Sequence, residues 1–279
     1  MATQLMIYES AVPVSQSRHG DWSIEAGADY SFSRNVNSVP LTAVEFASAA
    51  ADYVIIFAES GDVVMPAALL GMRDRENLYL ADKGEWKARY VPAFLRRYPF
   101  VFSSTDDGKN FTLCIDESFP GFNQEKRGES LYDEQKKPSQ YVENVLKFLQ
   151  QYQFEFQRTQ AFCKKLKELG LLEPMRAQIN LESGERISLT GFMVVDRTKL
   201  KALPADTLAE MAKSDELELI YNHLHSMRHF NGMRERLAVA APVPASEQVS
   251  VVDEPEPEKK ADTEKKGKAG KSEGAGRKK

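Results

Sequence analysis

The sequence predicts an α+β fold, a mostly antiparallel sheet with packed helices, followed by a disordered C-terminal tail. Turn residues recur at intervals of roughly ten between residues 53 and 116, which is typical of antiparallel hairpins. One long helix is indicated near residues 139–169, and a second hairpin follows it. Because strands and helices do not alternate regularly, this order favours α+β over a doubly wound parallel sheet.

The composition is sufficient for a core held together by burial alone. Of the 279 residues, 42% are hydrophobic, so disulfides are not needed. Cys114 and Cys163 lie in apolar stretches far apart in sequence, and we expect both to be ordinary core thiols. The first twenty residues do not show the basic start and apolar run of a secretory signal, so we do not expect export by that route, and no stretch reaches the roughly 20 apolar residues that span a bilayer. We therefore expect a cytoplasmic protein without a membrane span.

The first half of the chain is expected to be rich in strands. Extended segments and turns are expected over the first thirty residues, which lack periodicity. A helix is predicted to begin at Thr42, because Thr42 and Glu45 have the spacing of a capping box and Val44, Phe46 and Ala47 begin an apolar face. Five strands follow, predicted at residues 53–59, 63–72, 77–82, 99–104 and 111–116. Pro92 is expected to open a short helix within residues 90–98.

The second half is expected to be mainly helical. Residues 118–138 are polar and irregular, which predicts a long loop with mobility or a binding role. The helix after it should end at Gly170, and its apolar residues step by three and four along one buried stripe. The stripe consists of Val142, Val145, Leu149, Tyr152, Phe156, Cys163 and Leu166. A hairpin around Ser183 and Gly184 follows, and helices from Asp206 to about Leu237 complete the fold.

The tail differs from the rest of the chain in composition and charge. Proline, glycine, alanine and charged residues dominate from Ala241, so burial cannot offset the entropy of ordering this segment. We predict a globular domain at residues 1–238 and a disordered, Lys-rich tail at 239–279. Residues 241–279 carry 9 basic and 8 acidic side chains, whereas the preceding 240 residues carry 28 and 33, a net charge of -5. The basic end permits nonspecific contact with nucleic acid, but interspersed glutamates favour a solubilising role.

Three of the four histidines lie within seven residues, at His223, His225 and His229. On one helix His225 and His229 would share a face, as two metal ligands require. His223 would point elsewhere, and the segment lacks the glutamate of a metalloprotease motif. The pattern favours surface or core histidines, so we expect no metal site and keep His225 and His229 as the candidates for one.

Motifs that carry chemistry are otherwise scarce. Asp116 and Glu117 end a predicted strand, where neighbouring side chains point to opposite faces and cannot cooperate in acid–base work. Arg96 and Arg97 stand among aromatic residues, as in single-strand nucleic-acid sites, but the acidic domain opposes a groove for a phosphate backbone. The sequence has no glycine-rich phosphate loop, serine-hydrolase elbow or dinucleotide fingerprint. We therefore expect no cofactor.

Several stretches of the domain form a distinctive combination: RHGDWSI at 18–24, PAALLGMRDRENLYL at 66–80, WKARYVPAFLRRYPFVF at 86–102, YVENVLKFLQQY at 141–152, GFMVVDRTKLKALP at 191–204 and LELIYNHLHS at 217–226. Together they resemble the bacterial SapC family of surface-layer-associated proteins. The resemblance covers nearly the whole domain and stops at the tail. It implies an association with surface-layer protein production or transport, and of the histidine cluster only His223 matches the family pattern.

The leading hypothesis is an accessory protein without intrinsic catalysis that acts on a protein partner or client, with a link to surface-layer or envelope protein production or transport. Its candidate partner-binding residues are Arg89, Tyr90, Arg96, Arg97 and Tyr98. The alternative is an enzyme of unassigned reaction, with a polar pocket formed by His19, Arg34, Asn37 and Asp116. A third hypothesis, nucleic-acid binding, rests on the basic tail alone.

Overall fold

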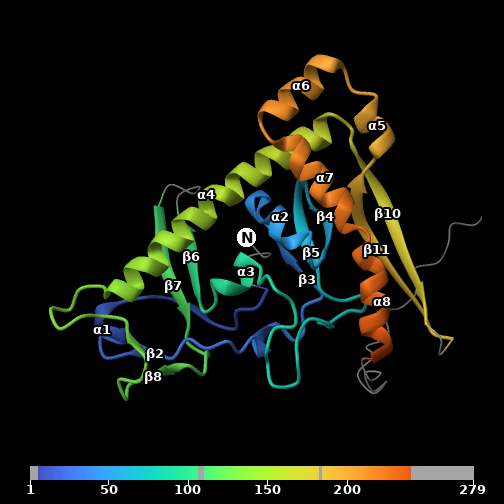
Figure 1. Cartoon of the computed structure of the whole chain (residues 1–279). Coiled ribbons are helices and arrows are strands. Elements are labelled where there is room, and N and C mark those ends of the chain that lie inside the picture. Colours follow the sequence, from blue (N-terminus) through green and yellow to red (C-terminus); the bar gives the residue numbers. More distant parts are fainter. Residues whose placement is uncertain (1–5, 106–109, 182–183, 240–279) are drawn as a thin grey trace, which may run out of the picture. The chain divides into compact units, whose positions relative to one another are not determined.

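The structure is a computed structural model that describes residues 6–105, 110–181 and 184–239. Its main sheet has five antiparallel strands in the order β10-β11-β4-β5-β3 (Figure 1). These strands are β3 (Ser38–Pro40), β4 (Val54–Ser60), β5 (Val63–Leu69), β10 (Leu172–Asn180) and β11 (Arg186–Val195). Gly61 has a φ of 60° in the tight turn between β4 and β5, a conformation that glycine adopts without strain. The antiparallel sheets and the several helices of the structure confirm the predicted α+β class.

Two smaller antiparallel sheets lie at the other end of the described fold. One has the order β1-β7-β6, with β1 (Ala11–Pro13), β6 (Phe100–Thr105) and β7 (Asn110–Asp116). The other has the order β8-β2-β9, with β2 (Ser23–Ile24), β8 (Phe122–Asn123) and β9 (Glu129–Ser130). The predicted loop at 118–138 therefore contributes two short strands to a sheet.

The long helix α4 (Gln140–Glu168) confirms the predicted helix near residues 139–169 and links two hydrophobic clusters. The Ser139 side chain accepts a hydrogen bond from the Val142 N–H, and Gly170 has a φ of 64° just after the last turn. Leu149 belongs to the cluster around the small sheets, whereas Leu166 belongs to the core of the main sheet. In Figure 1, α4 runs from the β6–β7 hairpin to the main sheet. One amphipathic helix thus joins both halves of the fold.

The remaining helices are short. They are α1 (Gln16–His19), the 3-10 helices η2 (Ser31–Ser33) and η3 (Ala43–Glu45), α2 (Phe46–Ala49), α3 (Ala93–Arg96), α5 (Arg197–Lys201), α6 (Ala205–Lys213), α7 (Glu216–Ser226) and α8 (His229–Val239). The capping box is present, because the Thr42 N–H donates to Glu45 Oε2 at 2.7 Å. The helix that it opens is only one turn of 3-10 helix and one of α-helix.

Helix α7 completes the main sheet where β4 and β11 separate. The two strands pair only at Met193 and Phe57. Beyond that point the ring of His223 lies between them, with Nδ1 donating to the Ile55 carbonyl at 2.9 Å and Nε2 accepting from the Val195 N–H at 3.0 Å. The Ile55 N–H donates in turn to Ser226 Oγ at 2.9 Å. Side chains of a helix therefore replace the missing ladder of backbone hydrogen bonds.

Several local predictions differ from the structure. Residues 77–82 form turns with one isolated bridge between Leu80 and Trp86, because the chain closes a tight loop there instead of extending. Val44 is 64% exposed, and the apolar face of the 42–50 segment is formed by Phe46, Ala49 and Ala50 instead. Cys114 and Cys163 are buried free thiols, as expected.

The predicted domain boundary falls at the edge of what the structure describes. Helix α8 continues to Val239, one residue beyond the predicted end of the domain at 238. The tail from residue 240 onward lies outside the described residues. Within the described ranges, no helix combines the length and apolarity needed to cross a membrane.

Candidate functional site

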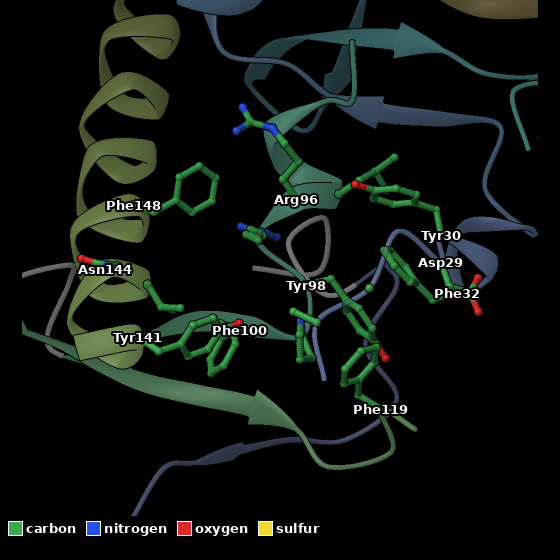
Figure 2. A pocket seen from close by; sticks show the side chains of 16 residues that line it. Asp29, Tyr30, Phe32, Arg96, Tyr98, Phe100, Phe119, Tyr141, Asn144 and Phe148 are labelled. Carbon is green, nitrogen blue, oxygen red and sulfur yellow. The ribbon is translucent and has the colours of Figure 1, made fainter. Parts of the chain in front are cut away.

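A pocket of about 410 Å³ lies between α3, the first half of α4 and the segment at residues 26–32, and we call it the α3–α4 pocket. Figure 2 shows Tyr141, Asn144 and Phe148 on one side of it, Tyr30 and Phe32 on the other, and Arg96, Tyr98 and Phe100 between them. The full lining is Ala26, Gly27, Asp29, Tyr30, Phe32, Leu95, Arg96, Arg97, Tyr98, Pro99, Phe100, Phe119, Tyr141, Asn144, Val145 and Phe148. The lining brings together four separate stretches of sequence.

Aromatic rings form most of the walls of the α3–α4 pocket. Phe32 stacks on Tyr98 with ring centroids 4.1 Å apart, and Phe119 meets Tyr98 edge to face at 5.5 Å. Phe100 and Tyr141 lie 6.0 Å apart. Ring pairs of this kind hold one another in place, so the pocket is preformed.

Arg96 lines the pocket, is exposed to solvent and is held in place by its neighbours. Nε donates to the Val91 carbonyl at 3.0 Å, and Nη2 donates to Tyr90 Oη at 3.3 Å. The guanidinium carbon lies 5.3 Å from the ring centroid of Phe148 and 5.7 Å from that of Tyr90. These contacts fix the orientation of the cation without neutralising it.

Glu45 holds Tyr90 and the start of α3 in place. Its Oε1 accepts hydrogen bonds from Tyr90 Oη at 2.8 Å and from the N–H of Ala93 at 2.7 Å. Ala93 is the first residue of α3. Its Oε2 closes the capping box at Thr42. Burial raises the pKa of Tyr90, and the neighbouring Glu45 carboxylate raises it further, so the phenol remains protonated and keeps donating.

Arg97 has a different role from that of Arg96, although both line the pocket. Arg97 is only 4% exposed, and its guanidinium carbon lies 4.3 Å from the Phe94 ring, 5.0 Å from Tyr152 and 5.7 Å from Tyr8. A buried cation packed among three rings stabilises the junction between α3 and α4. Arg96 is therefore the cation that faces solvent.

The predicted partner-binding residues divide into two groups. Arg96, Arg97 and Tyr98 line the α3–α4 pocket, whereas Arg89 and Tyr90 do not. Arg89 forms an ion pair with Asp52 at 3.0 Å on the exposed surface. A second hollow, of about 700 Å³, lies over β10 and β11, and none of the five residues lines it.

The four residues proposed for a polar enzyme pocket have separate hydrogen-bond partners. His19 is buried, with Nε2 donating to Glu117 at 2.8 Å and Nδ1 accepting from the Ser15 N–H. Arg34 donates to the Asp82 carbonyl, and Asn37 donates to the Arg73 carbonyl. None of the four lines the α3–α4 pocket or the hollow over β10.

Asp116 is a buried acceptor at the end of β7. Its carboxylate accepts from the N–H groups of Glu9, Ser10 and Ser118 and from the Ser118 hydroxyl at 2.8 Å. Burial alone would raise the pKa of Asp116, but these hydrogen bonds outweigh it and lower the pKa. This carboxylate ties the N-terminal segment to β7.

The metal-ligand candidates lie on different helices, because α7 ends at Ser226 and α8 begins at His229. The expected single face for His225 and His229 is therefore wrong, and the reason is the turn at residues 227–228. His225 is exposed, whereas His229 Nε2 donates to the Ala50 carbonyl at 2.9 Å. In the part of the chain that the structure describes, no three His, Cys, Asp or Glu side chains form a group that could hold a metal.

Several lining residues were not singled out from the sequence. Tyr30, Phe32 and Phe119 come from segments without periodicity, so no local pattern indicates them. Tyr141 and Phe148 are seven residues apart on α4, beside the predicted stripe, and this spacing places them on one helical face. Two of the five residues therefore had a signal that could have identified them.

Comparisons with known proteins give one result. A family model described as SapC matches residues 14–233, which includes every lining residue of the α3–α4 pocket. No curated protein and no solved structure matches the chain.

Proposed function

This chain belongs to the SapC family, and from that premise we propose that it is a cytoplasmic accessory protein that binds a protein client without intrinsic catalysis. The client would be a protein of the surface layer or envelope, because resemblance to the family implies a role in the production or transport of such proteins. We place the binding site at the α3–α4 pocket.

The observation that supports this proposal is the pairing of an exposed arginine with aromatic walls. Tyrosine and arginine are enriched among the residues that carry most of the energy of protein interfaces. The α3–α4 pocket presents Arg96 together with Tyr30, Tyr98 and Tyr141, all of which retain solvent exposure. Its volume lies within the roughly 300–1,000 Å³ that is typical of ligand pockets, so it suits a few inserted side chains.

A variant that blocks the α3–α4 pocket tests this proposal in the full-length protein. Asn144 is exposed on α4 and lines the pocket, so Asn144→Trp adds a bulky ring there without removing core packing. Gln150→Trp makes an equivalent change at an exposed α4 position that does not line the pocket. Each protein is captured from its native cells after crosslinking, and the bound proteins are identified and quantified.

The expected result is one stoichiometric envelope or surface-layer protein bound to the wild type and to Gln150→Trp, and its loss from Asn144→Trp. Equal capture by both tryptophan variants would place the interaction elsewhere. Failure of the wild type to capture any stoichiometric partner would refute the proposed function.

A further inference from the structure

The α3–α4 pocket also indicates which chemical features its occupant carries, an inference that rests on the proposed function. Four features of the site bear on this: the charge of Arg96, the ring-lined interior, the exposed backbone of Ala26 and Gly27, and the negative charge around the pocket.

Arg96 is a cation whose hydrogen-bonding capacity is only partly used. An arginine side chain has five N–H donors, and two are accounted for by the Val91 carbonyl and Tyr90 Oη. Across the described residues Arg96 forms no ion pair with a carboxylate, and the nearby Glu45 is engaged by Tyr90, Ala93 and Thr42. The planar fork between the Phe148 and Tyr90 rings matches the two oxygens of a carboxylate.

The interior beyond Arg96 is suited to an aromatic side chain. Tyr98 contacts the rings of both Phe32 and Phe119, and Phe100 and Tyr141 form the opposite wall. An inserted ring can meet these rings edge to face or in offset stacking, which adds to the gain from apolar burial. The charge and the ring slot lie in the same pocket, so one ligand reaches both.

The segment at residues 26–28 offers hydrogen-bonding groups to a polypeptide backbone. β2 is flanked by β8 and β9 at Ser23 and Ile24, and the Glu25 N–H still donates to the Gly121 carbonyl. Among the described residues, the N–H and C=O groups of Ala26 and Gly27 have no hydrogen-bond partner, although both residues line the pocket. An extended peptide can pair with such groups by strand addition.

The charge around the pocket limits how many anionic groups the occupant can carry. Asp29 also lines the pocket, and residues 1–240 carry a net charge of -5. This negative charge would repel a phosphodiester chain, which carries a charge on every nucleotide, whereas a single carboxylate aligned with Arg96 would be held. The chemistry therefore favours a peptide over a nucleic acid.

We infer that the α3–α4 pocket binds an extended segment of the client that carries one aromatic side chain and one carboxylate, with the ring among Phe32, Tyr98 and Tyr141 and the carboxylate on Arg96. The carboxylate is supplied either by an Asp or Glu side chain or by the C-terminus of the client.

Synthetic peptides test this inference with the full-length protein. The probes are N-acetylated octapeptides in a Gly/Ser background that contain Phe and Asp at separations of one to three residues, with amidated C-termini. Matched peptides replace Asp with Asn or Phe with Ala, and a further pair ends in Phe with either a free or an amidated C-terminus. Binding is measured by calorimetry at 0.15 M salt, a concentration chosen because it screens remote charges beyond about 8 Å.

At least one peptide with both groups is expected to bind the wild type. Its Asn counterpart should bind about ten- to a hundredfold more weakly, the loss that corresponds to a hydrogen bond with a charged group. Arg96→Gln should weaken binding of the Asp peptide by a similar factor and leave the affinity for the Asn peptide unchanged. Lys147→Gln, which removes the same charge from an exposed α4 position that does not line the pocket, should leave both unchanged.

The arms of the experiment separate the sources of the carboxylate and the class of ligand. Preference for the free-acid peptide over the Asp peptide assigns a C-terminus, and the reverse assigns a side chain. Equal binding of Asp and Asn peptides, or no binding by any peptide, overturns the inference. So does tighter binding of single-stranded octauridylate that Asn144→Trp abolishes. If Asn144→Trp nonetheless removes the captured client, the proposed function stands and only the ligand chemistry is wrong.

Discussion

Acidification should destabilise this protein through one buried residue, His223, well above the pH at which carboxylates protonate. Its Nε2 accepts from the Val195 N–H, and its Nδ1 donates to the Ile55 carbonyl. A second proton could go only to Nε2, where it would face the Val195 N–H instead of accepting from it. The junction between β4 and β11 therefore requires a neutral imidazole.

The magnitude follows from the pKa of His223. Burial lowers that pKa from 6.5 to about 4, and the hydrogen bond to the Ile55 carbonyl offsets only part of the effect. Between these two values the unfolded chain binds a proton that the folded chain does not, so the free energy of unfolding falls as the pH falls. The slope approaches about 1.4 kcal/mol per pH unit, and the total loss by pH 4 is about 3 kcal/mol. The stabilisation is fully present above pH 6.5.

The assay is urea unfolding followed by circular dichroism at several pH values from 7.5 to 4.5. His223→Gln retains an amide that can donate and accept but cannot titrate. The slope of its free energy of unfolding against pH should therefore be smaller than that of the wild type, by the amount that corresponds to about one bound proton. His225→Gln makes the same substitution at an exposed position of the same helix and serves as the matched control. Comparing slopes cancels any constant loss of stability caused by the Gln substitution.

The reasoning would be refuted if the two glutamine variants had the same slope between pH 6.5 and 4.5. A pKa near 6.5 for His223 in a proton NMR titration of the folded protein would refute it as well, because burial would then have no effect on the ring.

Substitutions at three further positions test the fold. Phe46→Ala should cost about 3 to 5 kcal/mol in urea unfolding, because Phe46 is fully buried, and a loss below about 1 kcal/mol would contradict its place in the core. Gly170→Ala should lower the free energy of unfolding by about 1 kcal/mol from backbone strain alone, since its φ is 64° and an added Cβ meets no atom within 4 Å. Gly170→Asn should cost less, and an equal cost would argue against strain. Asp116→Asn should destabilise by about 2 kcal/mol at pH 7, and the difference from wild type should shrink as the pH falls below 3.8, because the unfolded carboxylate takes up a proton there before the folded one does; a constant difference would contradict the lowered pKa.

Elements that depend on local periodicity could be predicted from the sequence. Helix α4 is one example, because the spacing from Val142 to Leu166 alone places those residues on one face. The β10–β11 hairpin is another, because two strand-like runs flank a turn that contains Gly184. Both predictions need only information from neighbouring residues.

The candidate site depended on contacts between distant residues. Arg96 and Tyr98 were candidates because cations and aromatic residues cluster near α3, but the same reasoning gave equal weight to Arg89, which is paired with Asp52. Exposure distinguishes Arg96 from its neighbour Arg97, and this depends on how α3 packs against α4. No local pattern records that packing.

The amino-acid sequence was sufficient for the α+β class, the long helix, the hairpins and the family, because each follows from composition, short-range periodicity or characteristic stretches. The structure was needed to bring Phe32, Tyr98 and Tyr141 into one pocket and to insert His223 between β4 and β11. Those arrangements arise from burial and hydrogen bonding between residues tens to more than a hundred positions apart. Such contacts form only when the chain folds, so a pattern of neighbouring residues does not reveal them.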